Sequence, residues 1–183
     1  FYLTREELDG VYSLKFERDL HPFQRKDGEV KALETIRFSI STHRGCYGEC
    51  SFCAIAVHEG RRVRSRSKAS IVAEAREITR HPLFKGRIHD VGGPSANMYA
   101  SGCERMEKKG CCTKRSCISP RVCPLLKSGL AEQIELLGAL RSIDGVKKVV
   151  VASGLRHDLV LADKKDGERY LKELVSHHVS GQM

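Results

Sequence analysis

The stretch STHRGCYGECSFCAIAVHEGRRVRSRSKASI, residues 41–71, places three cysteines within eight positions and follows them with a run of arginines. In TIRFSIST, residues 35–42, Ile36, Phe38 and Ile40 alternate with polar residues, which predicts a strand that runs into the cysteine loop. SKASIVAEAREITRH, residues 67–81, carries apolar residues on one helical face. We therefore expect a strand, a cysteine loop and a helix, in that order.

The same alternation of strands and helices continues along the chain. GRIHDVGG (86–93) and GVKKVVVAS (145–153) are typical of strands, and GLAEQIELLGALRSI (129–143) is typical of a helix. DKKDGERYLKELVSHH (163–178) predicts a further helix with Tyr170, Leu171, Leu174 and Val175 on its apolar face, and HVSGQM (178–183) would begin the next strand. The pattern predicts an α/β fold of βα repeats around a parallel sheet, with ligands at the carboxyl ends of the strands.

Two parts of the chain lie outside this pattern. Residues 1–34 predict a short helix capped by Thr4 and then an irregular arm, so residues 35–183 would form the core. Residues 95–127 follow neither helical nor strand periodicity and hold five cysteines, which predicts an insertion held by something other than an apolar core. The chain begins at Phe1 and ends within an apolar run, so we expect it to be a piece of a longer protein.

The composition favours an anionic partner. The 183 residues include 32 Lys and Arg against 23 Asp and Glu, a formal net charge of +9, which suits nucleic acid or a phosphorylated cofactor. No run reaches the roughly 18 apolar residues of a membrane span, and no signal segment opens the chain, so we expect a cytoplasmic protein with no membrane partner. Eight cysteines in such a protein point to metal or redox chemistry rather than disulfides.

The cysteines of the opening stretch have the spacing of a metal site. Cys46, Cys50 and Cys53 can converge on one soft-metal centre, and Gly45 and Gly48 let the backbone fold tightly around it. Structural zinc normally takes four ligands, usually as two separated pairs, whereas a triad suits an iron–sulfur cluster with one iron left open. Zinc completed by a distant ligand and plain buried thiols remain as alternatives.

The triad, with Phe52 before its last cysteine and a strand before the loop, resembles the signature of the radical S-adenosylmethionine (radical SAM) superfamily. The resemblance implies a [4Fe-4S] cluster, SAM on its unique iron, an electron donor, and a 5′-deoxyadenosyl radical that abstracts hydrogen from a substrate. It also implies that the chain is the N-terminal part of a partial (βα)6 TIM-like barrel. Residues 37–75, 85–99 and 145–159 are similar to the YgiQ-type radical SAM proteins.

The resemblance also implies a cofactor site. Gly92 and Gly93 match the superfamily's second motif, whose backbone meets the SAM amino group, although Pro94 stands where an acidic residue often lies. After the third strand, Ser153 and Arg156 are available to a ligand, and Arg156 could pair with a carboxylate of SAM or substrate. With Phe52, these residues are the candidate SAM ligands, and no catalytic side chain is assigned.

The cysteines of the insertion suggest a second metal site. Four thiolates on a metal would staple a segment that has little apolar character, and the plausible set is Cys103, Cys111, Cys117 and Cys123, with Cys112 as a spare. Zinc and a second iron–sulfur cluster both stay open, because the spacings fit no familiar zinc pattern. A flexible loop with free thiols is the other interpretation.

Three functions follow from these features. The leading hypothesis is a radical SAM enzyme with an undetermined substrate. CAIAVHEGRRVRSRS (53–67) is similar to the basic segment of tRNA-modifying methylthiotransferases, which makes RNA modification a narrower version. The non-enzymatic alternative is a metal- or cluster-stabilised module that binds nucleic acid.

Overall fold

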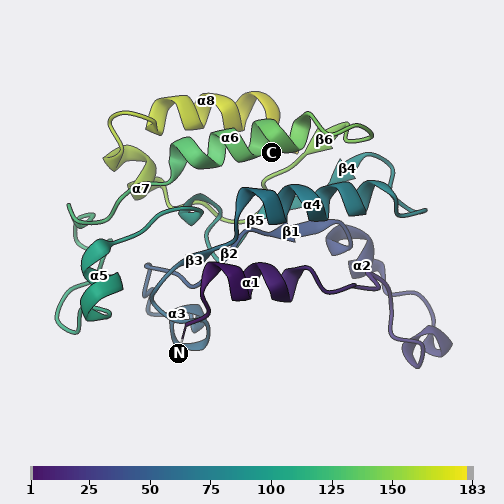
Figure 1. The fold of residues 1–183 in the computed structure, drawn as a ribbon, viewed down its shortest axis with the longest axis horizontal. Helices are drawn as coiled ribbons and strands as arrows, with labels where there is room; N and C mark the ends of the chain where they lie inside the picture. Colours follow the sequence, from purple (N-terminus) through teal and green to yellow (C-terminus); the bar gives the residue numbers. More distant parts are fainter. Residues whose placement is uncertain (1, 181–183) are drawn as a thin grey trace.

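The structure of the chain is a computed structural model that describes residues 2–180 (Figure 1). The helices are α1 (Arg5–Tyr12), η1 (Gln24–Asp27), α2 (Lys31–Ile36), α3 (Ile55–His58), α4 (Lys68–Thr79), η2 (Ala96–Met98), α5 (Glu104–Lys109), α6 (Leu130–Arg141), α7 (His157–Ala162) and α8 (Gly167–His177). The strands are β1 (Ser39–Ser41), β2 (His43–Arg44), β3 (Arg64–Ser65), β4 (Arg87–Ile88), β5 (Asp90–Gly92) and β6 (Lys148–Val149).

Three short parallel segments form the sheet. Ile40 in β1 pairs with Val91 in β5, and Ile88 in β4 pairs with Val149 in β6, both in parallel. The segment formed by β4 and β5 joins the β1–β5 pair to the β4–β6 pair. His89 N donates to Phe38 O, next to β1, at 3.0 Å, and Val91 N donates to Val150 O, next to β6, at 2.9 Å. Residues 87–92 are therefore the central strand, and the α/β fold with parallel strands agrees with the sequence.

Helices α4 and α6 cover the sheet and close the main core. α4 packs against α6, and α6 packs against β6 and α8, so the three helices lie side by side (Figure 1). Ser67 caps α4 as predicted, accepting from Ser70 N at 3.1 Å. The core between the sheet and these helices consists of Phe38, Ile40, Ile71, Ala75, Ile78, Ile88, Val91, Tyr99, Leu136, Leu137, Leu140 and Val149. The strand–helix alternation therefore builds the layer that the apolar periodicities predict.

The predicted strand over residues 35–42 is wrong in its first part. The KALETI segment is rich in helix-forming residues and folds as α2, so the strand begins only at Ser39. Ile36 ends that helix with 62% of its surface exposed, whereas strand alternation would have buried it. The irregular arm predicted up to residue 34 likewise contains η1 and the start of α2.

Other differences arise in the C-terminal half. The apolar face of α8 is narrower than predicted, because Tyr170 and Leu174 are buried against α6 and α7 while Leu171 and Val175 are exposed. Helix α7 was not predicted, since six residues are too few to show a helical period. Of the strand expected over residues 178–183, residues 181–183 lie outside the described part of the chain, and residues 178–180 form no strand, although Val151 N donates to His178 O at 2.9 Å.

The N-terminal helix is capped by Thr4 as predicted, whereas the insertion contains helices that were not predicted. Thr4 and Glu7 form a capping box at the start of α1. The insertion contains the short helices η2 and α5 and otherwise runs irregularly, closed by a bridge between Gly102 and Lys127. No helix within residues 2–180 is long and apolar enough to cross a membrane.

Candidate metal and cofactor site

The cysteine loop is closed at its base. β2 pairs with β3 in antiparallel register, which brings the two ends of the loop together. Cys46 N donates to Gly60 O at 3.1 Å, and Gly45 N donates to a carboxylate oxygen of Glu59 at 3.0 Å. Gly45 has φ +84°, and a Cβ there would clash with the carbonyl of Arg62. Glycine is therefore required at this turn.

Two sulfurs of the triad, those of Cys46 and Cys50, lie beside Gly48. A Cβ at this glycine would lie 3.3 Å from Cys46 Sγ and 3.4 Å from Cys50 Sγ, and the Gly48 N–H donates to Cys46 Sγ at 3.3 Å. Burial raises the pKa of the Cys46 thiol and the nearby Cys50 and Cys53 raise it further, while the Gly48 N–H and Arg156 oppose the rise. The three thiols thus lie close enough to interact, and a metal must displace the Cys46 proton to bind there.

Arg156 reaches the cysteine loop from the far side of the fold. Its guanidinium lies 3.5 Å from Cys50 Sγ and forms an ion pair with Asp158. The buried Asn97 holds its backbone, since Asn97 Oδ1 accepts from Arg156 N and Asn97 Nδ2 donates to Arg156 O, both at 2.8 Å. Asn97 was not among the predicted residues. The sequence feature that could have pointed to Asn97 is its amide side chain, which stands among the small residues that follow Gly93.

A cavity of about 290 Å³ opens beside the ends of β1 and β5. Among its lining residues are Gly92, Gly93, Ser153, Asp90 and His43. A Cβ on Gly92 would lie 2.9 Å from Ser153 Oγ, and one on Gly93 would lie 2.6 Å from the His43 ring. Both glycines are thus needed for packing within the protein, as well as for any ligand in the cavity. The Asp90 carboxylate accepts from the backbone N–H groups of Ala152 and Ser153. Asp90 was not among the predicted site residues, although a charged residue inside an apolar strand could have pointed to it.

Phe52 and the histidines beside the triad differ in their surroundings. Phe52 lies on the cysteine loop with 90% of its surface exposed, so it packs against no part of the protein. His58 ends α3 and is exposed. His43 is buried under Gly93, and its Nδ1 atom lies 2.8 Å from Thr42 Oγ1.

Acid is expected to destabilise the fold through His43. Burial lowers the pKa of His43 to about 4. Between pH 6.5 and pH 4 the His43 imidazole is protonated in the unfolded chain but stays neutral in the folded chain. The free energy of unfolding therefore falls as the pH drops from 6.5 towards 4. Urea unfolding of the metal-free chain at pH 7 and pH 4.5 measures this fall. Between these two pH values, the free energy of unfolding of the His43→Gln variant should fall by about 2–3 kcal/mol less than that of the unmodified chain. Equal losses in the two chains would refute this assignment.

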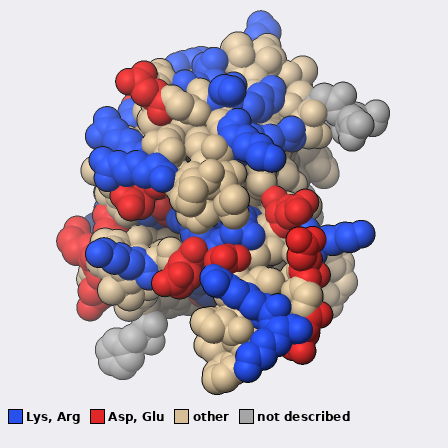
Figure 2. Space-filling model, turned by 90° about the vertical axis from the view of Figure 1, so that its right-hand side faces the viewer, with Lys and Arg blue, Asp and Glu red and all other residues tan. Residues whose placement is uncertain are grey.

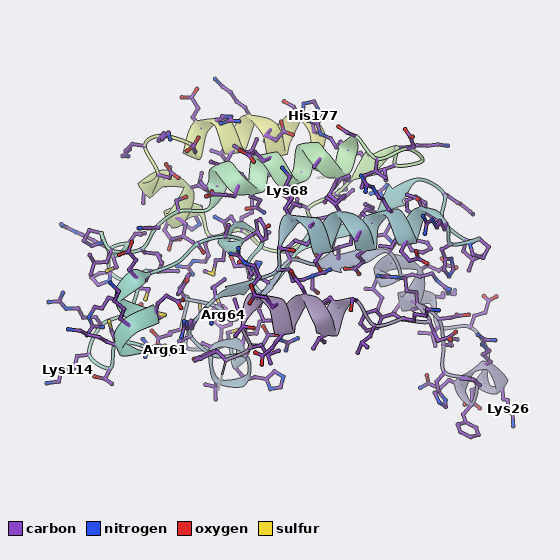
Figure 3. All side chains as sticks on the ribbon, viewed as in Figure 1. Lys26, Arg61, Arg64, Lys68, Lys114 and His177 are labelled. Carbon is purple, nitrogen blue, oxygen red and sulfur yellow. The ribbon has the colours of Figure 1, made fainter. Side chains whose placement is uncertain are left out.

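The arginines after the triad are bound within the protein. Arg61 pairs with Glu49 at 2.6 Å, and both Arg62 and Arg64 reach Glu107 of α5, with nitrogen–oxygen distances of 2.9 and 3.1 Å. In Figure 3, Arg61 and Arg64 lie between α5 and the N-terminal half of the fold. The basic run therefore ties the cysteine loop to the insertion.

Charges of both signs mix elsewhere on the surface as well. On the face shown in Figure 2, Lys and Arg side chains are interspersed with Asp and Glu. The net charge of +9 is therefore not concentrated in one continuous patch on this face.

The cysteines of the insertion surround a second cavity, also of about 290 Å³. Cys103, Cys112, Cys117 and Cys123 line it, whereas Cys111 does not and lies with its sulfur 3.9 Å from Tyr2 Oη. Burial raises the pKa of Cys117 to about 11, and the neighbouring thiols of Cys112, Cys123 and Cys103 contribute to the rise. Cys112, the spare in the set predicted from the sequence, therefore lies with Cys103, Cys117 and Cys123, whereas Cys111 does not.

The chemistry of the triad fits an iron–sulfur cluster. All eight cysteines are free thiols. Within residues 2–180, no three His, Cys, Asp or Glu side chains are arranged to hold a single metal ion. Three cysteines on one loop are a soft donor set of the kind that iron–sulfur clusters take.

The chain is similar to known proteins over nearly its whole length. A model of the radical SAM N-terminal family matches residues 1–39. UPF0313 proteins of Fusobacterium nucleatum and Thermotoga petrophila are each 50% identical to the chain, over 98% and 99% of its length and 32% and 31% of theirs. A UPF0313 protein of Clostridium perfringens is 49% identical over 99% of the chain and 27% of its own length.

The chain thus spans about a third of the length of the curated relatives it matches. Half of its residues are identical to theirs along nearly all of its own length, and the family model accounts for its N-terminal segment. The chain corresponds to one segment of the longer UPF0313 proteins, and its first 39 residues match the radical SAM N-terminal family.

Proposed function

We propose that this chain carries the cluster- and SAM-binding part of a radical SAM enzyme. The observation that carries the proposal is the placing of three cysteines on one closed loop, with the Cys46 and Cys50 sulfurs beside Gly48 and Arg156 3.5 Å from Cys50 Sγ. A four-iron cluster bound there would supply the electron that cleaves SAM into methionine and a 5′-deoxyadenosyl radical. The substrate and the electron donor are left open by the residues described.

The surrounding residues would hold SAM at the edge of the sheet. Gly92 O already accepts from Thr42 N at 2.7 Å and from Thr42 Oγ1 at 3.0 Å, so we expect the SAM ammonium group to meet the backbone of Gly93 instead. Arg156 would offset the negative charge of the thiolate-bound cluster or pair with the SAM carboxylate. Phe52, being exposed on the same loop, is free to cover the ligand.

The proposal includes a partial (βα)6 barrel. Parallel strands with helices α4 and α6 over one face are the repeating unit of such a barrel, and the other face would line its interior. The relatives are about three times as long as the matched segment, so the remaining strands would come from the rest of such a protein. A cytoplasmic location is part of the same proposal.

Binding of nucleic acid receives less support. Arg61, Arg62 and Arg64 are paired with carboxylates, and Arg66 is buried. These guanidinium groups therefore interact within the protein and are not available to bind nucleic-acid phosphates. RNA modification and a purely binding role both depend on that basic segment, so the radical SAM enzyme is the better-supported function.

Anaerobic reconstitution of the full-length protein with iron and sulfide tests the proposal. We expect visible charge-transfer absorption and, after reduction, an electron paramagnetic resonance signal that changes when SAM is added, because SAM would bind the open iron. Methionine and 5′-deoxyadenosine should then form. A protein that takes up zinc instead and shows no response to SAM would contradict the proposal.

A further inference from the structure

The insertion brings four cysteines together without burying much apolar surface. Its buried apolar group consists of Tyr47, Val63, Met98, Met106, Cys117 and Ile118, and two of these belong to the neighbouring cysteine loop. Between α5 and α6 the backbone is largely irregular. A segment of this kind needs a cross-link to keep one conformation.

We propose that Cys103, Cys112, Cys117 and Cys123 bind a second iron–sulfur cluster that holds the insertion in place. All four line one cavity, and they come from both ends of α5 and from the irregular segment beyond it. On binding, each thiol would release its proton to solvent as the sulfur–metal bond forms. The centre uses none of the residues of the triad.

The ligand set differs from the one that spacing alone suggests. Cys111 and Cys112 are neighbours in sequence, yet only Cys112 faces the cavity, with its sulfur 2.6 Å from Arg105 Nη1. Cys111 lies instead against Tyr2 from the N-terminal segment. The two adjacent cysteines therefore provide a matched pair for an experiment.

Backbone contacts already join two of the ligands and link them to the first site. Cys123 N donates to Cys117 O at 2.8 Å. Arg61 donates to Cys112 O at 2.9 Å while pairing with Glu49 of the cysteine loop (Figure 3). Loss of the second metal should therefore loosen the insertion and the arginines that bridge the two loops.

Metal content in a background without the first site provides the test. In the full-length protein with Cys46, Cys50 and Cys53 all changed to Ala, purified without oxygen, we expect about four irons with sulfide per chain. Adding Cys112→Ala should lower this residual iron at least severalfold, whereas adding Cys111→Ala should leave it unchanged. Zinc in place of iron and sulfide would overturn the second cluster.

A second measurement guards against misfolding and separates this proposal from the proposed function. In the otherwise unmodified protein, Cys112→Ala should lower the metal content and speed tryptic cleavage at Lys108, Lys109, Lys114 and Arg115, with the SAM-responsive signal of the first site still present. Cys111→Ala should change neither. Absence of residual metal in the triple variant, or equal metal loss in the Cys111 and Cys112 variants, would overturn the second centre whatever the first site does.

Discussion

Replacing Cys50 with alanine is expected to abolish SAM cleavage. Cys50 lies between Arg156, 3.5 Å from its sulfur, and Gly48, and it is the middle ligand of the triad. Two remaining thiolates would leave two irons without protein ligands, so a four-iron cluster with only one open position could not form. We expect 5′-deoxyadenosine production to fall to background and the SAM-dependent change in the paramagnetic resonance spectrum to disappear.

Cys111→Ala is the matched control for this variant. Cys111 is also a partly buried free thiol, but it lies outside both groups of proposed ligands. It should retain both the spectral response and SAM cleavage. If Cys50→Ala cleaved SAM at the rate of the control, the triad could not be the cluster site. If both variants were inactive, circular dichroism would show whether the fold had been lost.

Replacing Glu74 with glutamine is expected to destabilise the fold by about 3–5 kcal/mol, because it leaves a buried charge without its partner. The side chain of Arg66 is 0% exposed and that of Glu74 9%, with 2.5 Å between Nη1 and the carboxylate oxygen. Glu74 also pairs with Arg18. Arg66 donates to Ser41 O at 2.8 Å, so this ion pair also supports the end of β1 just before the cysteine loop. Urea unfolding followed by circular dichroism measures the loss.

Glu77→Gln on the same helix is the control. Glu77 pairs with Arg80, and both side chains are largely exposed, at 74% and 76%. Exposed pairs contribute little, so this variant should change stability by less than about 0.5 kcal/mol. Equal effects of the two substitutions would mean that the Arg66–Glu74 pair does not stabilise the fold.

The sequence predicts helix caps better than it predicts the boundaries of short elements. Ser67 and Thr4 cap the helices that they are expected to cap, because capping depends on a few adjacent residues. Strand alternation wrongly included Ile36, since the preceding residues prefer a helix and nothing in the local pattern decides between the two. The arginines after the triad look like a free basic surface until the fold brings Glu74 of the next helix and the more distant Glu107 against them.

The sequence by itself determined that the chain alternates strands and helices, that three cysteines share one loop, and that a second group of cysteines interrupts the pattern. Spacing along the backbone is enough for these conclusions. Only the tertiary structure decided that Arg156 meets Cys50, that Asn97 holds Arg156 there, and that Cys112 rather than Cys111 faces the other thiols. These contacts depend on how distant segments pack and on which way each side chain points, and neither property is contained in spacing along one strand or loop.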